Sequence, residues 1–97
     1  MAIVAVFQSP SLTQAKYEES VRRLTGGRTH LTTPADWPVE GLLVHVAGQG
    51  PNGFRVVDVW QSEETFKRFG EKLMPIMKAI GVEGQPEIYQ THTLVSA

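Results

Sequence analysis

The sequence predicts one α+β domain, in which two helices cover an antiparallel sheet of four strands. Short apolar runs rich in β-branched residues are typical of strands, and two longer segments space their apolar residues as a helix does. Clusters of glycine and proline separate these segments. Since the chain has 97 residues, a single domain over residues 1–97 is expected.

The first two elements are a strand and a helix. The run Ala2–Phe7, AIVAVF, is apolar throughout and fits a strand that is buried on both faces. A helix is predicted over residues 11–27, starting at Ser11 or Thr13; Ser11 and Gln14 have the spacing of a capping box. A pair of glycines ends it. Its apolar stripe contains Leu12, Ala15, Tyr17, Val21 and Leu24.

Residues 28–40 are predicted to form a loop, because they contain two prolines and no steady period. A loop this long is often a functional lid. Trp37 is its one large apolar side chain and is expected to point inward. It either pins the loop to the core or closes the mouth of a cavity. His30, in the same loop, is a weaker candidate for a functional histidine.

The second half begins with a hairpin. Strands are predicted over Gly41–Gly50 and Phe54–Trp60, with turn residues in between. A helix follows from the cap Ser62, and Pro75 is expected to kink or restart it. The last strand is predicted over Pro86–Val95. The order β-α-β-β-α-β is that of the ferredoxin-like plan.

The strands are apolar in both phases, which predicts a homodimer. In the first strand, Val4 and Val6 alternate with Ile3, Ala5 and Phe7, so both faces of the sheet need to be covered. Two helices cover only one face. A second copy of the chain is therefore expected on the other.

The composition excludes several classes of function. The formal net charge is −1, with no run of like charges, which does not fit a nucleic-acid or membrane-surface protein. The absence of cysteine excludes disulfides and thiol nucleophiles. The start of the chain lacks the features of a signal peptide, and no apolar run could span a membrane, so a cytoplasmic location is expected. The segment NGFRVVDV matches an RNA-binding signature only loosely, because Asn52 and Val56 replace its basic and aromatic residues.

Residues 53–77, GFRVVDVWQSEETFKRFGEKLMPIM, carry a resemblance to a known family. A strand ends at a tryptophan, and an acidic helix start with two phenylalanines follows. The residues concerned are Trp60, Ser62, Glu63, Glu64, Phe66 and Phe69. The chain resembles the small antibiotic-biosynthesis-monooxygenase proteins of the dimeric α+β barrel superfamily. The resemblance, which runs over the full chain, implies two sheets packed face to face as a barrel, with the helices outside.

The resemblance also implies a range of activities, among them cofactor-free oxygenation of aromatic polyketides, quinol oxygenation, haem degradation and polyketide cyclisation. Other members have no known activity. Haem degradation is excluded, because that branch has an asparagine in its first strand and a histidine in its second helix, and this sequence has neither. No cofactor is then expected.

Asp58 is a carboxylate in a strand of valines, and His45 is a polar residue in the strand before it. If Ala47 lies opposite Phe54, then His45 lies opposite Val56, and His45 and Asp58 are diagonal neighbours on one face, roughly 7–8 Å apart. In a structural interpretation, the two groups only satisfy each other's hydrogen bonds. In a functional one, Asp58 orients His45 as a general base.

The favoured function is a cofactor-independent monooxygenase or related tailoring enzyme that acts on a small aromatic or enolic substrate. His45 and Asp58 are the predicted catalytic residues, with His45 as the proton acceptor. The predicted substrate-binding residues are Trp60, Trp37, His92 (on the fourth strand) and Phe66. No metal site is predicted, because the three histidines have no ligand spacing. The alternative is a non-catalytic homodimer that binds a small ligand or has only a structural role.

Overall fold

The structure is a computed structural model that describes residues 1–28, 31 and 33–95. The strands are β1 (Ile3–Gln8), β2 (Leu42–Gly50), β3 (Gly53–Trp60) and β4 (Glu87–Gln90). The helices are α1 (Gln14–Thr25) and α2 (Glu63–Ala79), and a short 3-10 helix, η1 (Pro34–Asp36), precedes β2. Over these residues the predicted α+β class and the order β-α-β-β-α-β are confirmed.

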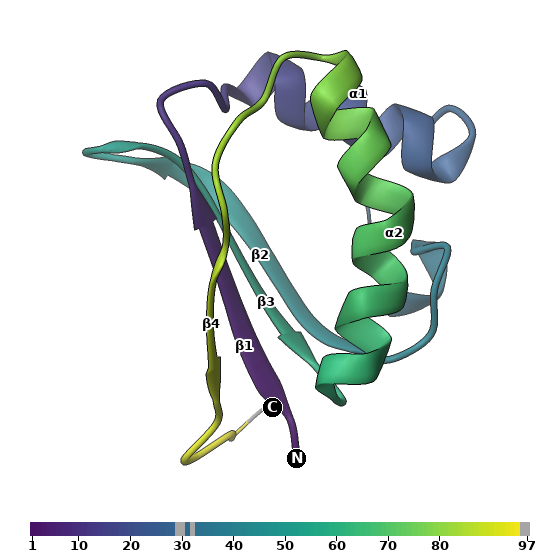
Figure 1. The fold of residues 1–97 in the computed structure, drawn as a ribbon, viewed down its shortest axis with the longest axis vertical. Helices are drawn as coiled ribbons and strands as arrows, with labels where there is room; N and C mark the ends of the chain where they lie inside the picture. Colours follow the sequence, from purple (N-terminus) through teal and green to yellow (C-terminus); the bar gives the residue numbers. More distant parts are fainter. Residues whose placement is uncertain (29–30, 32, 96–97) are drawn as a thin grey trace.

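The strands form one sheet in the order β2-β3-β1-β4, and every neighbouring pair is antiparallel. This topology is compatible with the ferredoxin-like plan. Both α-helices lie on the same side of the sheet (Figure 1). The fold therefore has two layers, and the sheet has one face that the helices cover and one face that is free of helices. Strands β1 and β3 lie in the middle of the sheet.

The β2–β3 register differs from the predicted one by two residues. Gly50 pairs with Gly53, so the turn contains only Pro51 and Asn52, and Gln49 rather than Ala47 lies opposite Phe54. Gly53 has φ 120°, which glycine adopts without strain and which permits the tighter turn. A shift of two residues leaves every side chain on its predicted face, but it brings His45 directly opposite Asp58.

The start of α1 also differs from the prediction. Thr13 is the N-cap, and its hydroxyl accepts a hydrogen bond from the Lys16 backbone N–H at 3.2 Å. The capping box predicted for Ser11 and Gln14 does not form. The Ser11 hydroxyl instead accepts a bond from the Glu83 N–H at 2.8 Å and donates to the Glu83 carbonyl at 3.2 Å. These bonds join the start of α1 to the segment that connects α2 with β4.

Helix α2 has the predicted N-cap, Ser62. The Ser62 side chain accepts from the Thr65 backbone N–H, and the Thr65 side chain accepts from the Ser62 N–H, which completes a capping box. The helix stops before Gly81, which has φ 79°. It runs without a break through Pro75, so the predicted restart there does not occur. Pro75 is exposed, and the carbonyl that loses its donor can be solvated.

Two clusters of buried side chains hold the helices on the sheet. One is centred on Trp60 and also contains Ile3, Ala5, Trp37, Leu42 and Phe69. The other contains Leu12, Phe54 and Val82. Both lie on the helix-covered face. No helix of the described residues is at once long enough and apolar enough to cross a membrane.

The helix-free face is apolar, as predicted. We call it the open sheet face. Cross-strand pairing brings its valines together, and Val46 and Tyr89 on it are 58% and 50% exposed. Over the part of the chain that the structure describes, no helix covers this face (Figure 1). Its apolar residues are Val4, Val6, Val44, Val46, Val57, Val59 and Tyr89, and the same register places the polar residues Gln8, Arg55 and Glu87 on it.

Candidate functional site

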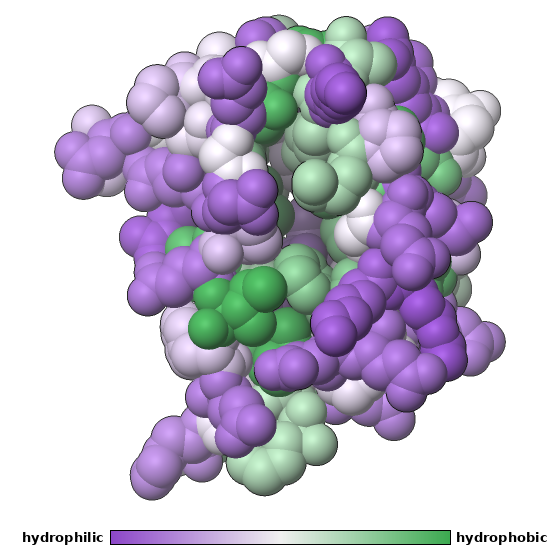
Figure 2. All heavy atoms as spheres, in the orientation of Figure 1, coloured by the Kyte–Doolittle hydropathy of each residue, from purple (hydrophilic) through white to green (hydrophobic). Residues whose placement is uncertain are grey.

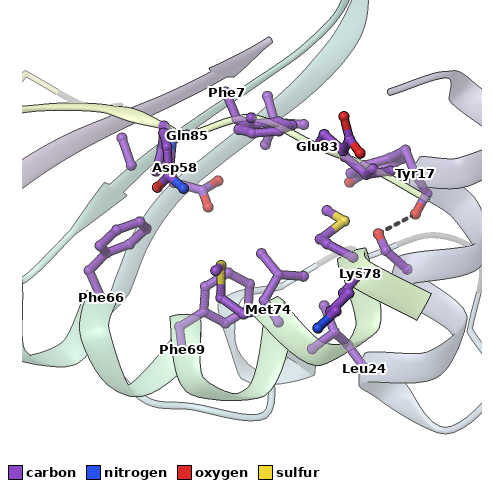
Figure 3. A pocket seen from close by; sticks show the side chains of 18 of the residues that line it. Phe7, Tyr17, Leu24, Asp58, Phe66, Phe69, Met74, Lys78, Glu83 and Gln85 are labelled. Atoms are coloured by element: carbon purple, nitrogen blue, oxygen red, sulfur yellow. Dashed lines mark hydrogen bonds between the residues drawn. The ribbon is translucent and has the colours of Figure 1, made fainter. Parts of the chain in front are cut away.

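A cavity of about 590 Å³ lies between the sheet and the helices. Figure 2 shows a hollow that opens to the surface between β4 and α2. The walls are largely apolar, with Phe66, Phe69 and Met74 projecting from α2 (Figure 3). The polar lining side chains are Tyr17, Ser20, His45, Asp58, Lys78, Glu83 and Gln85.

The His45–Asp58 pair forms one wall of this cavity. Because the two residues are directly opposite on β2 and β3, His45 Nδ1 lies 2.5 Å from Asp58 Oδ1. The side chains are only 13% and 8% exposed. A carboxylate can only accept, so Nδ1 carries the proton, and the second ring nitrogen, Nε2, of a neutral imidazole is an acceptor. The predicted shared face of His45 and Asp58 is confirmed.

Tyr17 completes a chain of three polar groups that the sequence did not reveal. Its hydroxyl lies 2.6 Å from His45 Nε2 and donates to it, and the two rings stack with an interplanar angle of 12°. Burial and, secondarily, the charge of Asp58 raise the pKa of Tyr17 to about 12. Tyr17 therefore holds its proton at neutral pH and acts as the donor in this bond.

Trp37 points inward, as predicted, and lines the cavity. It is 8% exposed and packs edge-on against His45, with 4.9 Å between ring centroids, and against Phe69 of α2 at 5.0 Å. The segment between η1 and β2 thereby reaches the polar chain and the helix layer together. His30, the other candidate of the predicted loop over residues 28–40, lies outside the described residues.

Phe66 lines the cavity, but Trp60 does not. Trp60 is fully buried behind the pair, stacks on Phe69 at 4.9 Å, and donates from Nε1 to Asp58 Oδ2 at 3.3 Å. Placing Trp60 in contact with a ligand was therefore wrong. The residue instead holds the second oxygen of the carboxylate and so fixes the orientation of Asp58.

His92 also lies elsewhere than expected. Strand β4 ends at Gln90, because its last partner on β1 is Ile3, where β1 begins. His92 follows the strand, is exposed, and its Nδ1 pairs with the Thr93 hydroxyl at 2.9 Å. It does not line the cavity, so the prediction that it belongs to the site was wrong.

The site has the groups for proton transfer beside an apolar binding space. A proton gained by His45 Nε2 would produce an imidazolium ion next to the Asp58 carboxylate, which would stabilise it. No set of three His, Asp or Glu side chains in the described residues is arranged to hold a metal ion. The cavity has the size of a typical small-molecule site.

Tyr17 was missed because its position on α1 fits the apolar stripe. A buried tyrosine usually finds a hydrogen-bond partner for its hydroxyl, and that rule is the one signal that could have marked it. The partner is 28 positions away, on another element.

No family model matches this chain, and no curated protein and no solved structure matches it at a significant level.

Proposed function

We propose that the protein is a cofactor-independent enzyme that removes a proton from a small aromatic or enolic substrate. The observation that carries the proposal is the Asp58–His45 pair in the wall of an apolar cavity. Asp58 fixes the tautomer of the imidazole and would stabilise the imidazolium that forms when His45 gains the proton. Phe66 and Phe69 provide aromatic surface for a flat substrate.

The expected chemistry after proton removal is oxygenation or ring closure. The electron pair left on the enolate or phenolate makes the substrate a reductant for molecular oxygen. When an activated methylene becomes a carbonyl, one oxygen atom enters the substrate and the other leaves as water. The substrate supplies all the electrons in that conversion, so no external reductant is needed.

The proposed assembly is a homodimer that packs two open sheet faces against each other, as in a dimeric α+β barrel. Support comes from the valines of that face, which no helix of the described residues covers and of which Val46 is 58% exposed. Light scattering at micromolar concentration should give the mass of two chains. Val46→Lys, on the exposed part of the face, should give one chain, whereas Lys72→Glu on α2 should leave two.

The second candidate function is binding without catalysis. It is favoured by one observation: both ring nitrogens of His45 already have protein partners. In the described residues, every buried side-chain nitrogen and oxygen has a hydrogen-bond partner without a ligand present. A polar chain of this kind can serve only to join α1 to the sheet.

Oxygen uptake with a panel of phenols, quinols and anthrones separates the two functions. For an enzyme, His45→Ala should remove most of the turnover and leave the dimer intact, and Asp58→Asn should have a milder effect. His92→Ala, outside the cavity, is the matched control and should retain full activity. Binding of panel members with no oxygen uptake and no product would reject the enzyme and support the binding protein.

A further inference from the structure

Both ring nitrogens of His45 face protein groups. Nδ1 faces Asp58 at 2.5 Å, and Nε2 faces the Tyr17 hydroxyl at 2.6 Å. The Tyr17 ring stacks on the imidazole, and the Trp37 ring packs edge-on against it. A ligand in the cavity therefore has no free nitrogen of His45 to contact while Tyr17 stays in place.

Both ends of the chain, Tyr17 and Asp58, line the cavity, but both Asp58 oxygens already accept hydrogen bonds, so the Tyr17 hydroxyl is the better placed end for a ligand. Tyr17 lies on α1 and lines the cavity (Figure 3). Its oxygen donates one bond to His45 and has acceptor capacity left for a hydroxyl group of a ligand. We propose that Tyr17 is a catalytic residue that takes the proton of a phenolic or enolic hydroxyl and passes its own proton to His45. This inference rests on the proposed function.

The step balances without any co-reactant. The O–H bond of the substrate breaks, and its proton forms a new O–H bond on Tyr17. The original O–H bond of Tyr17 breaks, and that proton forms an N–H bond at His45 Nε2. The electron pair stays on the substrate oxygen, and the positive charge resides on the imidazolium ion beside Asp58.

The surroundings of Tyr17 favour simultaneous transfer of the two protons. Burial and the charge of Asp58 raise the pKa of Tyr17 to about 12, so a free tyrosinate is costly in this place. When one proton arrives as the other leaves, no tyrosinate accumulates. The hydroxyl then remains a donor to the anionic oxygen of the substrate, and Tyr17 stabilises the product of the step as well.

The experiment uses 4-nitrophenol as the probe, because its ionised form absorbs visible light and its neutral form does not. It is done with the full chain below the pKa of the free probe. The bound probe should be ionised in the wild type. Tyr17→Phe should bind it and lower the ratio of ionised to neutral probe about tenfold or more, since a hydrogen bond to a charged oxygen is lost. Tyr89→Phe, on the open sheet face, should retain the wild-type ratio.

The possible results separate this inference from the proposed function. Ionisation that persists in Tyr17→Phe and disappears in His45→Ala would overturn the relay, while His45 would remain the base. A wild type that binds the probe in its neutral form, or does not bind it, would overturn both.

A second measurement covers the case in which Tyr17→Phe does not fold. Tyr89→Phe is produced with 3-fluorotyrosine, so that only Tyr17 carries fluorine and its phenol becomes a stronger donor. The relay predicts a higher ratio of ionised to neutral probe than in Tyr89→Phe with ordinary tyrosine. An unchanged ratio would overturn it.

Discussion

Removing the carboxylate of Asp58 should destabilise the fold by a calculable amount. In Asp58→Ala, two donors lose their acceptor: Nε1–H of Trp60, which is fully buried, and Nδ1–H of His45, which is nearly so. A buried donor without a partner costs about 1–3 kcal/mol. Water can reach part of His45, so its cost lies near the lower limit, and we expect a total of about 2–4 kcal/mol.

Asp58→Asn separates the contribution of the hydrogen bonds from that of the side-chain volume. Its amide oxygen can still accept from one of the two donors, so the expected loss is about 1–2 kcal/mol. Urea unfolding followed by far-UV circular dichroism, at one fixed protein concentration, gives the free energy of unfolding. Glu71→Ala, at an exposed position on α2, is the control and should stay within about 0.5 kcal/mol of the wild type. Equal losses for Asp58→Ala and Asp58→Asn, or none for either, would refute this account of the pair.

Three other predictions concern Tyr17 and two structural positions. In an alkaline absorbance titration, Tyr17 should ionise near pH 12, and Tyr17→Phe should lack this step. The folded pKa of about 12 is above the ordinary value of 10.0. The stability that this group contributes is therefore complete below pH 10 and is lost as the pH rises through 12. Gly41→Ala should lower the free energy of unfolding by about 1–3 kcal/mol, because φ is 111° and the new Cβ would lie 2.6 Å from Cβ of Thr65; an unchanged urea midpoint would contradict this. Ser62→Ala removes the cap of α2 and should cost about 1 kcal/mol in the same assay, whereas Ser62→Asp should restore most of it.

The sequence predicts the faces of the strands well and their register poorly. The assumed pairing of Ala47 with Phe54 placed His45 and Asp58 on the same face. Because a side chain changes face with every residue, the actual shift of two residues leaves them there. Register depends on the turn, and the sequence between the strands permits more than one turn length. The structure uses the shortest, Pro51 and Asn52, and this choice turns a diagonal pair into a direct contact at 2.5 Å.

The remaining site residues depend on how the layers pack, which local patterns do not encode. Tyr17 of α1 meets His45 of β2 only through the packing of the helix layer on the sheet, a contact between residues 28 positions apart. Trp60 is among the predicted substrate-binding residues, yet its ring lies in the core and only its N–H serves the site. The sequence alone does not distinguish an aromatic residue in the core from one in the wall of a cavity, because both environments are apolar.

The positions of the two tryptophans mean that intrinsic tryptophan fluorescence should report on the state of the site. Trp37 packs against the His45 ring, with 4.9 Å between ring centroids, and Trp60 donates to Asp58, so both indoles of the chain lie beside the His45–Asp58 pair. A positively charged imidazole quenches indole emission, and arrival of a proton on His45 should therefore dim the protein's own fluorescence. Unlabelled protein could then be screened against small molecules in plate format. For the same reason, tryptophan fluorescence recorded during unfolding would follow the disruption of the site rather than the loss of the sheet.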